Sequence, residues 1–202
     1  VVFPGFEIAS NDKTHYVCLF PEDTTVQQLD RYLGNLKLHD PADGIRPSRL
    51  SSEELIEEVD LLGGFIYAAH CTQESGLLKN RLNHVWKHPK LRAAQIPGSI
   101  DDLTSIEGDF YRKVFLNKDD GYRRERPVAA INAKDVAKPD DLDQPSATCF
   151  IKMTRPTFAA FKVAFLDPGS RVRLNSQQAQ SPIGKVVRMT VAGGYLDGVR
   201  VD

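Results

Sequence analysis

The stretch SSEELIEEVDLLGGFIYAAHC, residues 51–71, decides the fold class. Ser51 and Ser52 precede acids in the next turn, which predicts the start of an amphipathic helix, because hydroxyls cap free backbone N–H groups and carboxylates suit the helix dipole. Gly63 and Gly64 end that helix, and residues 65–71 form an apolar run of strand length. An apolar strand without polar alternation is typical of a sheet that helices cover.

The same alternation of helix and strand extends along most of the chain. We expect further helices at 26–36, 75–88, 106–117 and 157–166, the last with Pro156 in its first turn. We expect further strands at 15–20, 92–98, 127–133 and 148–153. This order predicts an α/β protein in which the later strands neighbour each other in one mainly parallel sheet, either open or closed as a barrel.

Both ends of the chain suggest a piece of a longer polypeptide. The apolar run at 1–3 is interpreted as the end of a strand that starts upstream, with Glu7 following it. The polar segment 175–185 predicts a linker, and 186–202 predicts a β-hairpin connected at Gly193-Gly194. Seventeen residues cannot bury a core of their own, so the hairpin is expected to open another domain.

Composition sets broad limits on compartment and partners. The net charge of −1 over 202 residues excludes a global electrostatic field that would attract the chain to nucleic acid or anionic membrane. It does not exclude a local basic patch. The three cysteines (Cys18, Cys71 and Cys149) are an odd number in apolar surroundings, which favours buried thiols over disulfides. No apolar stretch approaches the length of a membrane span, so a cytoplasmic location is expected.

Four residues from separate elements are candidate metal ligands. Glu7 and His70 stand at the ends of apolar runs, Asp135 lies two residues past the strand at 127–133, and His15 opens another strand. Ligands gather at the carboxyl ends of strands in parallel α/β proteins, and imidazole with carboxylate suits zinc, manganese or iron. Each residue also has a simpler interpretation: a hydrogen-bonded structural histidine, a surface acid, or a turn or capping aspartate.

Other chemistry finds less support in the sequence. Motifs for dinucleotide binding, a nucleophilic serine, a P-loop or a zinc-protease helix do not occur. Arg123 and Arg124 belong to the basic stretch YRRERP, which could bind phosphates or form a solvated turn. Lys134 and Lys138 lie on either side of Asp135 and are better placed to meet a phosphate near a metal.

Several ordered motifs resemble the PHP (polymerase and histidinol phosphatase) superfamily. The segment PGFEI with a following strand-opening histidine is similar to the family's PGxE turn and its next ligand strand. GGFIYAAHCTQESGLL resembles a later histidine-bearing strand, and INAKDVAKPDDL occupies the place of the last ligand motif. IKMTRPTFAAFKVAFLDPGSRVRL is similar to the segment after that motif in bacterial proteins that fuse PHP to an ATPase, and GGYLDGVRVD resembles the opening strands of an SMC/ABC-like ATPase.

The resemblance implies a fold and a set of site residues. Residues 1–174 would be the later part of a distorted (β/α)7 barrel, followed by the linker and an ATPase hairpin. Glu7 would bridge two metal ions (Zn, Mn or Fe), while His15, His70 and Asp135 would each bind one. Two departures bear on this set: the family's first ligand motifs would lie upstream of Val1, and Ala137 stands where a histidine ligand is expected.

The resemblance also implies an activity. It suggests a metal-dependent phosphoesterase acting on nucleic acid or nucleotides and coupled to the fused ATPase, through which it would oligomerise and which alone would use ATP. Lys138, one residue past the missing histidine, would supply the positive charge in catalysis, and Lys134, Arg123 and Arg124 would bind substrate. The alternative is a degenerate, non-catalytic PHP domain that stabilises or regulates the ATPase.

Overall fold

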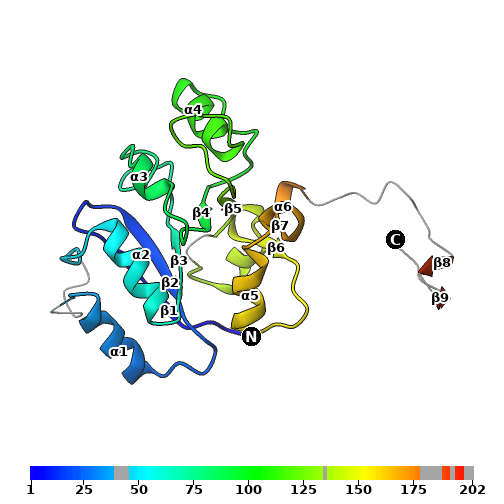
Figure 1. Ribbon diagram of the computed structural model, residues 1–202, viewed down its shortest axis with the longest axis horizontal. Helices are drawn as coiled ribbons and strands as arrows, with labels where there is room; N and C mark the ends of the chain where they lie inside the picture. The colour runs from blue at the N-terminus through cyan, green and yellow to red at the C-terminus, as the bar shows by residue number, and fades with distance from the viewer. Residues whose placement is uncertain (39–45, 134–135, 178–187, 192–193, 198–202) are drawn as a thin grey trace.

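A computed structural model describes residues 1–38, 46–133, 136–177, 188–191 and 194–197. Its main feature is a five-stranded sheet in the order β1-β2-β3-β4-β5 (Figure 1). The strands are β1 (Gly5–Ala9), β2 (His15–Leu19), β3 (Phe65–Ala68), β4 (Ala93–Gln95) and β5 (Ala129–Ile131). The pairings β1–β2 and β2–β3 are antiparallel, whereas β3–β4 and β4–β5 are parallel. The α/β class is therefore confirmed, but the sheet is mixed and not mainly parallel.

The last predicted strand of this sheet lies elsewhere. β6 (Cys149–Ile151) pairs antiparallel with β7 (Val172–Leu174) in a separate two-stranded sheet. β7 contacts β5, which is the edge strand of the main sheet. The β6–β7 pair therefore lies next to that edge (Figure 1). The expectation that β6 joins the strands at 65–70 and 127–133 in one sheet was wrong, because its backbone hydrogen bonds go to β7.

Side chains cap the starts of most of the described helices. They are α1 (Val26–Asn35), α2 (Ser52–Leu61), α3 (Asn83–Trp86), α4 (Ile106–Phe115), α5 (Phe158–Ala164) and α6 (Pro168–Arg171), with 3₁₀ turns at Pro139–Asp143, Pro145–Ala147 and Asn175–Gln177. Thr25 and Ser51 each accept the third backbone N–H of their helix in a complete capping box. Thr157 caps α5, so Pro156 precedes the helix instead of lying in its first turn.

Two further expectations about local structure fail. Only α3 forms within the helix expected at 75–88, because Ser75 and Arg81 adopt positive φ angles of 60° and 57°, which a right-handed helix does not accept. β1 starts at Gly5, so Glu7 lies within a strand and not after one. Gly5 itself is required there, since a Cβ atom would lie 2.1 Å from the carbonyl oxygen of Cys18 on β2.

The core explains why β3 is apolar throughout. Ile66 and Ala68 belong to the larger buried cluster, which includes side chains of α2. Phe65 and Tyr67 point to the opposite face and pack in a second cluster with Phe161 and other residues of α5. Both faces of β3 are covered, so a polar side chain on either face would be buried away from water. The strand is therefore apolar at every position.

The cysteines and the C-terminal residues bear on two further expectations. Cys18 and Cys71 are buried free thiols whose pKa burial raises, while Cys149 is partly exposed. Within the described residues, no helix has the length and apolar character that crossing a bilayer would require. β8 (Arg188–Val191) and β9 (Gly194–Asp197) pair as a hairpin, whereas Gly193 and most of the expected linker lie outside the described residues.

A buried polar cluster joins the turn between β1 and β2 to the start of α2. Asp12 accepts hydrogen bonds from the Ser10 hydroxyl (2.6 Å), the Ser52 hydroxyl (2.8 Å) and the Ser52 backbone N–H (3.0 Å). Burial opposes ionisation of this carboxyl, but the hydrogen bonds from Ser10, Ser52 and Thr14 outweigh it, so the pKa of Asp12 is lowered. The fold is therefore more stable with Asp12 ionised than with Asp12 protonated.

Asp12→Asn is expected to reduce the free energy of unfolding by about 2 kcal/mol at neutral pH, since it removes charged hydrogen-bond acceptors. A lowered folded-state pKa contributes stability above the unfolded value of about 3.9, and that stability is lost as pH falls through the folded-state pKa. Urea titrations from pH 7 to pH 2 should show a smaller acid loss in the variant. Asp30→Asn, on the exposed side of α1, is the control, and an equal effect there would contradict the assignment.

Candidate metal centre

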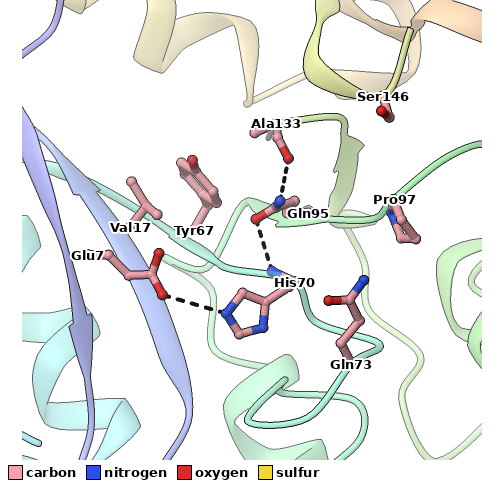
Figure 2. A pocket seen from close by; sticks show the side chains of 9 residues that line it. All are labelled: Glu7, Val17, Tyr67, His70, Gln73, Gln95, Pro97, Ala133 and Ser146. Atoms are coloured by element: carbon pink, nitrogen blue, oxygen red, sulfur yellow. Dashed lines mark hydrogen bonds and ion pairs between the residues drawn. The ribbon is translucent and has the colours of Figure 1, made fainter. Parts of the chain in front are cut away.

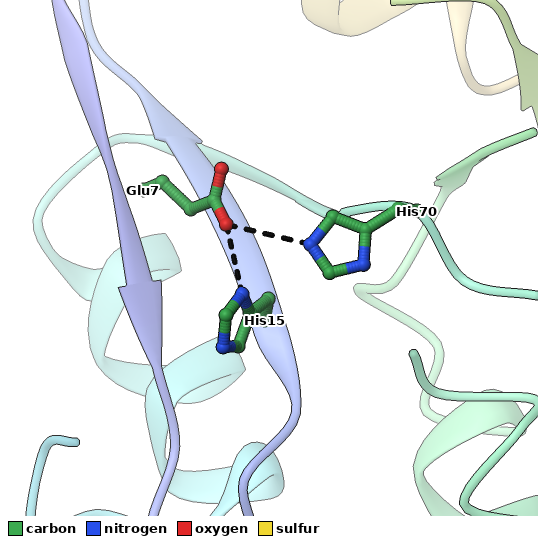
Figure 3. A group of neighbouring side chains, drawn as sticks. All are labelled: Glu7, His15 and His70. Carbon is green, nitrogen blue, oxygen red and sulfur yellow. Dashed lines mark hydrogen bonds and ion pairs between the residues drawn. The ribbon is translucent and has the colours of Figure 1, made fainter. Parts of the chain in front are cut away.

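Three of the four predicted ligands converge at the β1–β2–β3 side of the sheet (Figure 3). Oε1 of Glu7 lies 2.9 Å from Nδ1 of His15 and 3.5 Å from Nε2 of His70. One ligand atom from each residue lies within 4.8 Å of the other two. The histidine rings meet edge to face with centroids 5.1 Å apart. The side chains are 27–43% exposed, so solvent and ions can reach them.

Strand register brings Glu7 and His15 together. Ala9 is directly opposite His15 in the antiparallel β1–β2 pair, and Glu7 is two residues before Ala9 on the same face. Diagonal neighbours of this kind are within reach of long side chains. The backbone carbonyl of His15 also accepts the N–H of Ala69, which holds the end of β3 beside it.

His70 follows β3 in an unusual backbone conformation. Its φ angle is +26°, which residues other than glycine rarely adopt. The side chain of Gln95 holds this turn: its Oε1 accepts the His70 backbone N–H at 2.9 Å, and its Nε2 donates to the carbonyl of Ala133 (Figure 2). One side chain at the end of β4 thus ties together the residues that follow β3 and β5.

A cavity of about 450 Å³ opens beside Glu7 and His70 (Figure 2). Its lining consists of Glu7, Val17, Tyr67, His70, Gln73, Gln95, Pro97, Ala133 and Ser146. The sequence interpretation missed Gln73, Gln95 and Ser146. Gln95 could have been found, because it is the polar residue at the carboxyl end of a short apolar strand, the rule that selected His70. Gln73 and Ser146 lie in turns that show no such signal.

The remaining predicted residues do not join the cluster. Asp135 and Lys134 lie outside the described residues. Lys138 is exposed and does not line the cavity; its backbone N–H and that of Ala137 donate to Oδ2 of Asp141 at 3.1 and 3.0 Å. The short turn at 137–141 is therefore organised by Asp141.

Arg123 and Arg124 lie before β5, at the opposite end of that strand from Ala133. Arg123 forms an ion pair with Asp120 at 2.9 Å. They line a separate cavity, so the structure does not bring them to the cluster.

The donor set fits a divalent ion. Two imidazole nitrogens and one carboxylate oxygen are ligands that zinc, manganese and iron accept, and catalytic zinc sites commonly have three protein ligands with one open position. The hydrogen bond between Glu7 and His15 shows that these ligand atoms already meet without a large rearrangement. Glu7, His15 and His70 are therefore the residues that could hold a metal here.

Fold and cluster together define a mixed α/β domain with a candidate metal centre beside its sheet. The lesion-specific endonuclease PfuEndoQ from Pyrococcus furiosus has a similar fold: the TM-score is 0.53 at 15% identity, over 83% of this chain and 39% of that one. A structure of endonuclease Q with a 27-mer duplex containing an abasic lesion gives 0.49 at 15% identity, over 83% and 40%. The chain thus spans about two fifths of these proteins. Neither protein-family models nor curated proteins match the sequence.

Gln95→Met is expected to weaken metal binding about 10-fold, because it removes both hydrogen bonds that hold the turn at His70, and supporting residues around a metal typically contribute 10–100-fold. Zinc titration against a competing chelator measures this. Gln73→Met is the matched control, since Gln73 lines the same cavity. Its hydrogen bond to the carbonyl oxygen of His70 comes from the backbone N–H, so the change keeps it. Equal affinities in the two variants would contradict a positioning role for Gln95.

Proposed function

We propose that the chain is part of a PHP-type, metal-dependent phosphoesterase that acts on nucleic acid. The observation that carries the proposal is the convergence of Glu7, His15 and His70 beside an open cavity. The fold likeness to a lesion-specific endonuclease supports it, as does the order of PHP-like motifs. At 15% identity that likeness concerns the fold, so activity and substrate rest on the site.

The residues of the chain have distinct roles in this proposal. Glu7, His15 and His70 would hold the ion beside the cavity, with Asp135 as a further proposed ligand. A divalent ion in such a site activates water near neutral pH and polarises a phosphoryl oxygen. Gln95 keeps His70 in its strained conformation. Lys134 and Lys138 contribute positive charge for the phosphate, whereas Arg123 and Arg124 would contact substrate only at the second cavity.

The finer parts of the assignment are also proposals. Residues 1–174 would form the later part of a (β/α)7 barrel, 175–185 a linker, and 186–202 the first strands of an ATPase. Coupling to that ATPase, oligomerisation through it and a cytoplasmic location rest on the same resemblance. The parallel pairing of β3, β4 and β5 and the contact of β7 with β5 support the barrel.

A non-catalytic role is the second candidate. Ala137 stands where a histidine ligand is expected, and its backbone N–H donates to Oδ2 of Asp141. A domain with this change could bind metal and stabilise or regulate the ATPase without hydrolysing a phosphodiester. This candidate predicts metal binding without turnover.

The experiment that separates these roles combines metal analysis with hydrolysis. The full chain is loaded separately with Zn²⁺, Mn²⁺ and Fe²⁺, and the release of product from bis(p-nitrophenyl) phosphate and from a labelled abasic DNA duplex is measured. Bound metal with turnover supports the phosphoesterase. Bound metal without turnover under every ion supports the non-catalytic role, and absence of bound metal would overturn both.

Lys138→Ala is expected to lower hydrolysis about 10-fold with little change in bound metal, because it removes the positive charge that is proposed to act on the phosphate and removes no ligand. Ala137→His should raise metal stoichiometry or affinity if that position completes the ligand set. Both variants are compared with Lys118→Ala, an exposed lysine that follows α4. An unchanged hydrolysis rate in Lys138→Ala would show that Lys138 is only a surface charge without a role in catalysis.

A further inference from the structure

A second cavity, of about 570 Å³, lies at the amino end of β4 and β5. Six cationic side chains line it: Lys87, Lys90, Arg92, Arg123, Arg124 and Arg126. Arg92 immediately precedes β4, and Arg126 lies three residues before β5. The metal centre includes His70, which lies two residues past the end of β3, so the two cavities belong to opposite ends of the parallel strands.

Two of the six cations are neutralised by carboxylates. Lys90 Nζ lies 2.6 Å from Oε2 of Glu57 and 2.9 Å from Oδ2 of Asp60. Arg123 pairs with Asp120 at 2.9 Å. These pairs involve Glu57 and Asp60 of α2 and Asp120 of the loop before Arg123, and they leave the other four cations of the cavity to be considered.

Arg124 is held in place by the protein backbone. Its Nε donates to the carbonyl of Arg126 at 3.1 Å, and its Nη1 donates to the carbonyl of Trp86. The backbone of Arg124 also forms two hydrogen bonds with the side chain of Asn117, at 2.8 and 2.9 Å. Burial lowers the pKa of this guanidinium to about 10, so it stays charged at neutral pH. Within the part of the chain that the structure describes, no ion pair balances this charge.

The remaining three cations are available to a ligand. Among the residues that the structure describes, no ion pair involves Lys87, Arg92 or Arg126. Glu125 is the carboxylate in the lining, and it is exposed. Four positive charges without an ion-pair partner among the described residues line this cavity with one acid, which favours an anion.

We propose that this basic pocket binds a phosphate group, carried by a free nucleotide or by a nucleic-acid strand that passes this end of the sheet. Arginines are suited to this, because the planar guanidinium donates two parallel hydrogen bonds to a phosphate. The volume lies within the range of small-molecule sites. Leu166, which is 42% exposed, provides an apolar wall for the sugar or base.

The test compares a double variant with a matched control. Binding of AMP and of an unphosphorylated decathymidine oligonucleotide is measured by calorimetry in the presence of a chelator, so the result does not depend on the metal centre. Arg92→Gln with Arg126→Gln is expected to weaken binding at least about 10-fold, as the loss of two charge-assisted contacts implies. Arg31→Gln with Lys118→Gln removes the same charge from exposed positions elsewhere and should change affinity less than twofold.

The two probes identify the source of the phosphate. If AMP binds and the pocket variant loses this binding, the phosphate is that of a nucleotide. If only the oligonucleotide binds, the phosphate is that of a nucleic-acid strand. Thermal unfolding of each variant checks that the fold is intact. The proposal is overturned when neither probe binds at millimolar concentration, or when the pocket variant and the control lose affinity equally.

Discussion

On the proposed function, Glu7→Gln is expected to prevent retention of a divalent ion and to lower phosphodiester hydrolysis by at least about 100-fold. Glutamine keeps the size of the side chain but removes the charge that attracts the cation, and Glu7 is the residue that contacts both His15 and His70. A 100-fold loss corresponds to about 2.7 kcal/mol of transition-state stabilisation, which is modest for removal of a metal.

Metal content after dialysis, measured by plasma mass spectrometry, and the hydrolysis rate under added metal are the two readouts for this change. Glu74→Gln is the matched control, because Glu74 is an exposed carboxylate in the same loop as His70 and lies outside the cluster. If Glu7→Gln retains its metal, the proposed centre is wrong. If it loses metal while hydrolysis persists, catalysis occurs elsewhere in the protein.

Gly76→Ala is expected to destabilise the fold by about 2 kcal/mol and to weaken metal binding about 10-fold. A Cβ atom at this position would lie 2.6 Å from the backbone carbonyl oxygens of both His70 and Cys71. Backbone atoms cannot move aside as a flexible side-chain end can, so the turn that holds His70 must shift. Overpacking of this kind typically costs about 1–3 kcal/mol.

The thermal midpoint should fall by about 4–8 °C, as that loss implies for a chain of this size. Gly34→Ala is the control, because Gly34 lies in α1 with no atom within 4 Å of the added Cβ, and alanine there is expected to stabilise the helix slightly. Metal affinity is measured at about 10 °C, well below the thermal midpoints of the unchanged protein and of Gly76→Ala. A loss of affinity at this temperature reports displacement of His70 and not unfolding. Unchanged affinity in folded Gly76→Ala would contradict the coupling between this glycine and the site.

The local structure was predictable wherever neighbouring residues determine it. Thr25 and Ser51 start helices because each hydroxyl accepts an N–H three residues away. A strand within 65–71 was predictable from the uniform apolarity of β3, which reflects burial on both faces, although β3 ends at Ala68. The same approach failed at 75–88, where backbone turns at Ser75 and Arg81 replace most of a helix.

Strand pairing was predicted less well than strand existence. β6 forms where it was expected, but it pairs with β7 and not with the main sheet. The antiparallel pairing of β2 with β3 also lay beyond reach, since two helices separate them in the chain. Which strand edges meet depends on contacts between distant segments, and no pattern within one segment records it.

By itself, the sequence determined the α/β class, the capped starts of α1 and α2, and a short set of residues able to bind metal. Only the tertiary structure decided which of them meet: Glu7, His15 and His70 lie together, whereas Arg123 and Arg124 line a cavity at the other end of β4 and β5. It also revealed Gln95, whose hydrogen bond holds His70 in its turn. The physical reason is the distance along the chain over which each interaction acts. Helix capping and hydrophobic periodicity act over a few residues. A binding site is assembled by strand register and packing between segments far apart in the chain.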